Sequence, residues 1–272
     1  MNERRWRRFA AYGPAFVLVV ALLLLWEVGV RAGRIDVTLV PAPSAILEAL
    51  ENKRDVLLTH SIQTMLETVL GLALATVLGV AIAVAIDLSS WLRRALYPLL
   101  VASQTIPMVA LAPLLLVWFG FDILPKVILV VLYCFFPITV ACADGLLSVD
   151  PDLVRLIRSM RASRWQILWL VRLPGAMPSF FSGLRIAATY SVTGAIIGEY
   201  VGAEQGLGIF MQTSANAHAI VLVFAAIVIT TVLSLALFAL VSLVERIVLP
   251  WQESAQRRAF GVAGTPTGPK YM

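Results

Sequence analysis

The residues best suited to bind a partner lie in one segment, residues 144–182, called here the basic loop. Arginine recurs along it between apolar side chains. A guanidinium group hydrogen-bonds to carboxylates and phosphates, and an exposed apolar helix face requires a partner. The residue types therefore favour docking over bond-making chemistry. Two docking surfaces fit the pattern: anionic lipid, with the arginines on headgroups, or a groove on a soluble protein.

Start and stop signals divide the basic loop into two short helices. Asp150-Pro151 is typical of a helix start, and Ser163 with Gln166 has capping-box spacing. We expect a sharp corner near Arg161-Ala162 and an end to the second helix at Leu173-Pro174. The candidate docking residues are Leu153, Arg155, Leu156, Ile157, Arg158, Met160, Arg161, Ser163 and Trp165.

A second group of polar residues interrupts long apolar stretches. A carboxylate at mid-membrane costs about 2.5–3.5 kcal/mol, so such residues point to function. We predict that some of them line a small polar pathway for a solute: Gln104, Thr105, Tyr190, Thr193 and Glu199. Glu199 has an alternative interpretation, a snorkelling or interface role close to the outer boundary.

Small residues recur every four positions in the same region, at Gly194, Gly198 and Gly202. Such rows let helix backbones approach closely in lipid. Ordinary packing within the chain and a sliding helix at a gate or subunit interface both fit this pattern.

Motifs typical of enzymes do not occur in the sequence. There is no G-x-x-x-x-G-K-[ST] phosphate loop, no H-E-x-x-H and no G-x-S-x-G. Cys134 and Cys142 lie in an apolar run without metal-ligand spacing, and we interpret them as packed thiols. We expect no metal, no cofactor and no catalytic residue in this chain.

The composition places these residues in a membrane protein. Of 272 residues, 60% are hydrophobic and 14% charged, against about 45–50% and about 25% in soluble domains. Six apolar stretches are long enough to span a bilayer, and we interpret the prolines in the third and fourth as kinks. The predicted spans cover residues 11–30, 62–86, 96–119, 125–143, 183–201 and 220–244. The fold expected is an all-α polytopic membrane protein.

Basic residues set the predicted orientation. Most of the 21 Lys and Arg fall in segments that share one side of the membrane if both termini are cytoplasmic, and Lys126 is among the few outside. We therefore assign the net charge of +5 to cytoplasmic loops and expect no nucleic-acid partner. The predicted divisions are a basic tail with the first span (1–31), an extracytoplasmic segment (32–61), a transmembrane core containing the basic loop (62–250), and a disordered tail (251–272).

The basic loop resembles the coupling loop of type I ABC importer permeases, whose pattern is E-A-A, three residues, G, nine residues, then I-x-L-P. Its spacing falls on Arg155-Leu156-Ile157, Arg161 and Val171-Arg172-Leu173-Pro174, with Leu173 and Pro174 matching. Arginine replaces both the glutamate and the glycine. Further segments are similar to the nitrate/sulfonate/taurine branch: Leu111-Ala112-Pro113-Leu114, Trp118-Phe119-Gly120, Phe135-Phe136-Pro137 and Gly206-Leu207-Gly208. Residues 183–192 also look like permeases for hydroxymethylpyrimidine-type thiamine precursors.

The resemblance implies a permease subunit in a bacterial cell (inner) membrane. It implies a second permease copy, two ATPase subunits that bind the ATP, and an extracytoplasmic solute-binding protein. The substrate class implied is a thiamine-precursor pyrimidine, or alternatively a sulfonate, taurine or nitrate. From the residues alone, an ion-coupled secondary transporter remains the other function to weigh, although no buried relay of ionisable groups stands out.

Overall fold

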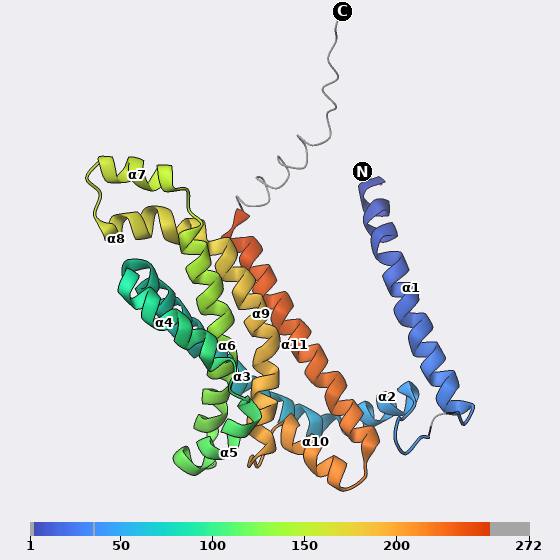
Figure 1. The fold of residues 1–272 in the computed structure, drawn as a ribbon. Coiled ribbons are helices and arrows are strands. Elements are labelled where there is room, and N and C mark those ends of the chain that lie inside the picture. The colour runs from blue at the N-terminus through green and yellow to red at the C-terminus, as the bar shows by residue number, and fades with distance from the viewer. Residues whose placement is uncertain (1–2, 35, 251–272) are drawn as a thin grey trace, which may run out of the picture. The chain divides into compact units, whose positions relative to one another are not determined.

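The computed structural model describes residues 3–34 and 36–250, and this part of the chain is helical, with no strand. The tail predicted to be disordered, residues 251–272, lies outside the described residues. The chain divides into two compact units, one formed by residues 1–63 and 204–231, the other by residues 64–203 and the chain from residue 232 onward. Figure 1 labels the helices of both.

The first unit contains α1 (Glu3–Arg31), α2 (Pro43–Asn52), the beginning of α3 (Arg54–Leu88), α10 (Leu207–Asn216) and the beginning of α11 (Ile220–Val248). Glu27 joins its first two helices. The Glu27 carboxylate accepts hydrogen bonds from the Ser44 amide at 3.1 Å and the Ser44 hydroxyl at 2.8 Å. A carboxylate at the start of α2 is stabilised by the helix dipole, so the α1–α2 connection is fixed at this point.

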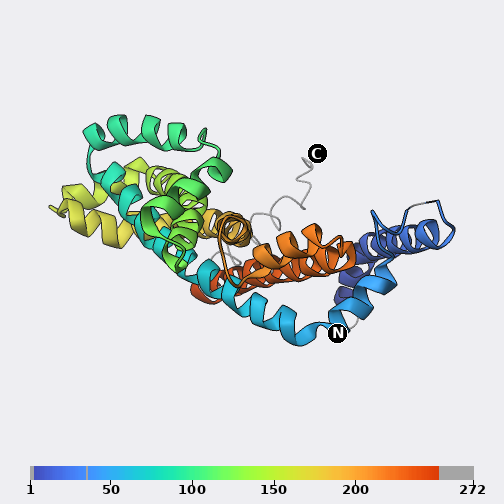
Figure 2. The same cartoon turned by 90° about the horizontal axis from the view of Figure 1, so that it is seen from below.

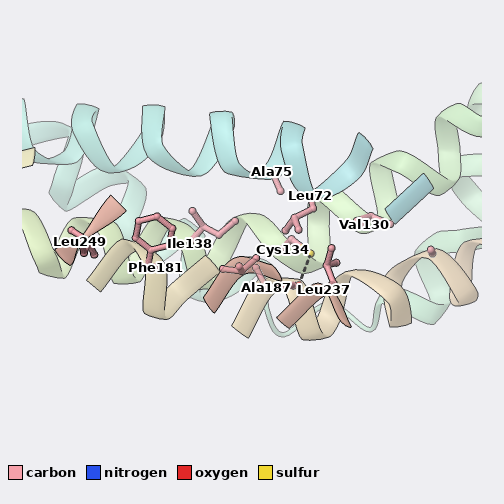
Figure 3. Close-up of a cluster of buried hydrophobic side chains, with 12 residues drawn as sticks. Leu72, Ala75, Val130, Cys134, Ile138, Phe181, Ala187, Leu237 and Leu249 are labelled. Carbon is pink, nitrogen blue, oxygen red and sulfur yellow. Dashed lines mark hydrogen bonds between the residues drawn. The ribbon is translucent and has the colours of Figure 1, made fainter. Parts of the chain in front are cut away.

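The second unit contains the rest of α3 and α11, together with α4 (Ser90–Ser103), α5 (Met108–Phe119), α6 (Ile123–Leu147), α7 (Pro151–Ser159), α8 (Arg164–Ile167), a π-helical turn (Leu168–Arg172) and α9 (Leu173–Tyr200). Its core lies where α6 and α9 pack against α3 and α11 (Figure 3). Cys134 on α6 donates from Sγ to the Ala187 carbonyl on α9 at 3.3 Å, and Cys142 is also buried. Both cysteines are thus packed thiols.

The small residues of α9 face α6. A Cβ added at Gly183 would lie 2.6 Å from the Pro137 carbonyl oxygen. At Gly194 it would lie 3.1 Å from Val130 Cα, and at Gly198 3.0 Å from Lys126 Cα. Because these distances leave no room for a side chain, glycine is what permits the close antiparallel approach of α6 and α9.

Four helices in the described part of the chain are long and apolar enough to cross a membrane: α3, α6, the continuous helix Arg164–Tyr200, and α11. A fifth crossing results if α4 and α5 together form one span. Large apolar side chains are exposed along these helices, as expected for surfaces that contact lipid. The six-span arrangement stays a prediction.

The predicted third span is broken rather than kinked. The axes of α4 and α5 differ by 98°, and Pro107 caps the start of α5. Backbone groups at a break inside a membrane need partners within the protein. The hydroxyls of Ser103 and Thr105 supply two, donating to the carbonyls of Leu100 at 2.7 Å and Ala102 at 2.8 Å. The prolines alone did not predict the break because Pro98 and Pro113 remain inside helices.

Candidate functional site

The first helix of the basic loop, α7, begins as its sequence predicts. The Asp150 carboxylate accepts the Asp152 amide hydrogen bond at 2.8 Å, and Pro151 occupies the first turn. Val154 is buried, whereas Leu156 and Met160 have 60% and 73% of their surface exposed. One side of α7 therefore packs on the rest of its unit through Val154. The other side, with Leu156 and Met160, is apolar and exposed.

The predicted corner is a tight turn at Arg161. Its φ of +63° lies in the left-handed region, where a non-glycine residue costs roughly 1–2 kcal/mol. The Arg161 amide donates to the Arg158 carbonyl at 3.0 Å and the Ala162 amide to the Ile157 carbonyl at 3.4 Å, which is a Schellman motif. Arginine therefore takes the conformation for which the family pattern has glycine.

The second helix starts with the predicted capping box. The Ser163 hydroxyl accepts the Gln166 amide at 3.2 Å, and the Gln166 side chain accepts the Ser163 amide at 2.7 Å. The predicted helix end at Leu173-Pro174 is wrong, because the chain continues without interruption into α9. Pro174 lacks a backbone donor, and the π-helical turn just before it shifts the hydrogen-bond register.

An ion pair ties the basic loop to α3. Arg172, at the end of the π-helical turn, contacts the carboxylate of Asp87, whose side chain is only 2% exposed. This pair connects the base of the basic loop to the end of α3. Figure 1 shows α7, in yellow-green, and α8, in yellow, at one end of α6, and Figure 2 shows the pair extending to the side of α6.

Sequence reasoning missed a buried polar cluster formed by Thr64, Glu67, Lys126 and Glu199. Lys126, which the sequence places among the basic residues on the outer side, is buried, and its ammonium lies 3.6 Å from Glu67 Oε1. The Thr64 hydroxyl donates to Glu199 Oε1 at 2.6 Å. Both carboxylates are fully buried. The cluster joins α3, α6 and α9. The signal available in the sequence was a lysine at the edge of one predicted span together with glutamates inside two others.

Glycine at position 198 makes this cluster possible. An added Cβ would lie 3.2 Å from both Cβ and Cγ of Lys126, so the lysine stem runs directly across Gly198. Glu199 follows in sequence and is buried, which rules out the snorkelling alternative for it.

The predicted pathway residues occupy different places. Gln104 and Thr105 are exposed at the break between α4 and α5, and Gln104 caps the end of α4. Tyr190 and Thr193 are exposed on α9, whereas Glu199 is turned into the protein. The structure thus joins Gln104 with Thr105 and separates Glu199 from Tyr190 and Thr193. The third glycine of the row, Gly202, faces the Phe121 ring, 2.7 Å from an added Cβ.

Comparison with known proteins identifies the family. The family model described as binding-protein-dependent transport system inner membrane component matches residues 75–249. This range includes the basic loop and Lys126. The chain belongs to this family. It is the permease subunit of an ABC importer and a multi-pass inner-membrane protein.

Relatives cover nearly the whole permease. ThiX of Halalkalibacterium halodurans, a formylaminopyrimidine transport permease, is 37% identical over 91% of this chain and 98% of its own. The riboflavin permease RibX of Chloroflexus aurantiacus is 35% identical over 89% and 92%. The taurine permease TauC of Escherichia coli is 29% identical over 88% and 89%. These relatives include members of the branch indicated by the sequence.

Solved structures share the fold. The permease aligns with a chain of the inward-facing MetNI methionine ABC transporter with a TM-score of 0.65 and 20% identity, over 73% of this chain and 98% of that one. A chain of an amino acid ABC transporter aligns with a TM-score of 0.60 and 17% identity.

Proposed function

We propose that this permease imports a small solute with energy supplied by separate ATPase subunits, and that the basic loop is the lever between the two. The observation that carries the proposal is the construction of α7. Leu153, Leu156 and Met160 are exposed on a short helix held by Asp150, Val154 and the corner at Arg161. A rigid amphipathic helix is suited to lie in a groove on a soluble subunit.

The route of force follows from the ion pair at the base of the loop. Arg172 joins the lever to Asp87 on α3, and the unbroken helix Arg164–Tyr200 continues it into α9. ATP binding would change the position of the groove, and the lever would move α3 and α9 between inward-facing and outward-facing arrangements. Both termini and the basic loop face the cytoplasm in this arrangement, with six spans, as the distribution of Lys and Arg favours.

The assembly we propose contains two permease copies, two ATPase subunits and an extracytoplasmic solute-binding protein, embedded in membrane lipid. The solute proposed is a thiamine-precursor pyrimidine, supported by the similarity to ThiX over almost its full length. A sulfonate, taurine or nitrate is the second candidate, supported by the similarity to TauC. The ligand bound by the partner solute-binding protein would decide between them.

The lever is tested by uncoupling. In the assembled transporter, Arg158→Glu reverses a charge on α7, and Leu156→Pro interrupts the helix. We expect both variants to lose substrate uptake while the ATPase subunits still hydrolyse ATP. Leu47→Pro on α2, outside the basic loop, is the matched control for a proline in a short helix and should leave the relation between ATP hydrolysis and uptake unchanged. Normal uptake in both basic-loop variants would refute the lever.

The solute pathway is tested separately. Gln104 and Thr105 lie where a span is broken, and discontinuous helices in transporters line binding sites. We propose that these two residues, with Tyr190 and Thr193, contact the solute, and that Glu199 supports the pathway from inside the protein. Gln104→Ala should raise the substrate concentration for half-maximal uptake, whereas Glu199→Gln should lower the maximal rate. Unchanged uptake kinetics in both variants would remove them from the pathway.

A further inference from the structure

A cavity of about 550 Å³ lies between the end of α3 and the base of the basic loop. We call it the basic pocket. Its walls carry three guanidinium groups, from Arg158, Arg164 and Arg172, against one carboxylate, Asp87. Asp87 is already paired with Arg172. The pocket is therefore strongly positive and suited to an anion.

The arginines of the pocket have unused hydrogen-bonding capacity. Within residues 3–34 and 36–250, neither Arg158 nor Arg164 forms an ion pair, and the buried Nε of Arg172 has no hydrogen-bond partner. A buried donor without a partner costs about 1–3 kcal/mol, more for a charged group. A phosphate group offers several acceptor oxygens and pairs with guanidinium in a forked geometry.

The pocket lies where a candidate membrane span ends. Asp87 and Leu88 end a span, and Arg172 lies within the continuous helix that contains another. Three tryptophans close in sequence to these residues are exposed: Trp91 near the start of α4, and Trp165 and Trp169 in the helix that contains Arg172. Exposed tryptophan is typical of the headgroup level, and basic pockets between spans on the cytoplasmic side bind anionic lipid headgroups.

We propose that the basic pocket binds the phosphate of an anionic phospholipid. The apolar side of α7 stays available for the ATPase, because Leu156 and Met160 are not part of the pocket. The lipid would bridge α3 and the base of the loop and so hold the lever in position. This assignment rests on the chain being a membrane protein. It does not require that α7 docks on an ATPase.

The test measures lipid binding by the assembled transporter. Native mass spectrometry in detergent would follow titration with phosphatidylglycerol and, in parallel, with phosphatidylcholine. We expect phosphatidylglycerol to bind in preference. The double variant Arg158→Gln/Arg164→Gln should weaken that binding about 30-fold. Each basic residue near a lipid surface contributes about 1 kcal/mol, and the loss of two corresponds to this factor. The matched control, Arg94→Gln on α4, removes an arginine outside the pocket and should leave the affinity close to that of the unmodified protein.

Four results would overturn the proposal. Equal binding of the two lipids, or equal affinity in the double variant and the control, would mean that the arginines do not select an anionic headgroup. Binding of phosphatidylglycerol only after the ATPase is removed would assign the pocket to an acidic side chain of that partner. Inorganic phosphate that binds as tightly as the lipid would make free phosphate the occupant. These results concern lipid binding only. Failure of the proposed lever would instead be seen as normal substrate uptake in the variants Arg158→Glu and Leu156→Pro.

Discussion

Replacing Lys126 with methionine tests the buried polar cluster most sharply. The change keeps the length of the side chain but removes the charge 3.6 Å from Glu67. Both side chains are at least nine-tenths buried, so water cannot replace the lost partner. Breaking a buried ion pair from one side costs about 3–5 kcal/mol, because the remaining buried carboxylate loses its cationic partner. For a chain of this size, this corresponds to a fall of roughly 10 °C in the midpoint of thermal unfolding.

Thermal unfolding in lipid nanodiscs would measure this loss. Arg54→Met is the matched control, because Arg54 pairs with Asp55 at 3.5 Å while both side chains are largely exposed, and such pairs contribute about 0–1 kcal/mol. The double variant Lys126→Met/Glu67→Gln should recover part of the stability, since it also removes the buried charge of Glu67. A Lys126→Met midpoint no lower than that of the control would refute the cluster as a structural element.

Three further changes follow from the same geometry. Gly198→Ala places a Cβ 3.0 Å from Lys126 Cα and should lower the stability of the protein by about 1–3 kcal/mol through overpacking. Gly13→Ala, whose added Cβ has nothing within 4 Å, should not destabilise the protein. Equal unfolding midpoints of the two variants would contradict this prediction. Arg161→Gly relieves the positive φ and should stabilise the corner by about 1 kcal/mol, read as slower hydrogen exchange of the Ala162 amide; faster exchange would argue against strain there. Asp87→Asn should loosen the basic loop and reduce uptake per ATP hydrolysed, and unchanged stoichiometry would exclude the pair from force transfer.

The sequence predicted local structure in the basic loop well because the signals there are local. Asp150-Pro151 and the Ser163–Gln166 capping box depend on contacts within one helical turn, and both are present. The helix end at Leu173-Pro174 was wrong because a proline in the first turn after a π-helical segment can be accommodated without a break.

Features that depend on pairs distant in sequence were not predicted. Lys126 is counted on the outer side from sequence because it lies at the edge of a predicted span, but the Gly198 surface on α9 lets it turn inward to Glu67. Asp87 directly follows the predicted span 62–86, and only the fold brings Arg172 to it. The break between α4 and α5 was missed because three prolines are compatible with either a kink or a break, and packing decides between them.

The most direct test of the central claim is cross-linking from α7 in the intact transporter. Leu156→Cys places a reactive thiol on an exposed position, while the native Cys134 and Cys142 are buried and should not compete. We predict that a short thiol-reactive cross-linker captures the ATPase subunit, and that the yield changes when ATP is bound. Capture of phospholipid alone, with no ATP-hydrolysing subunit under either condition, would contradict the account.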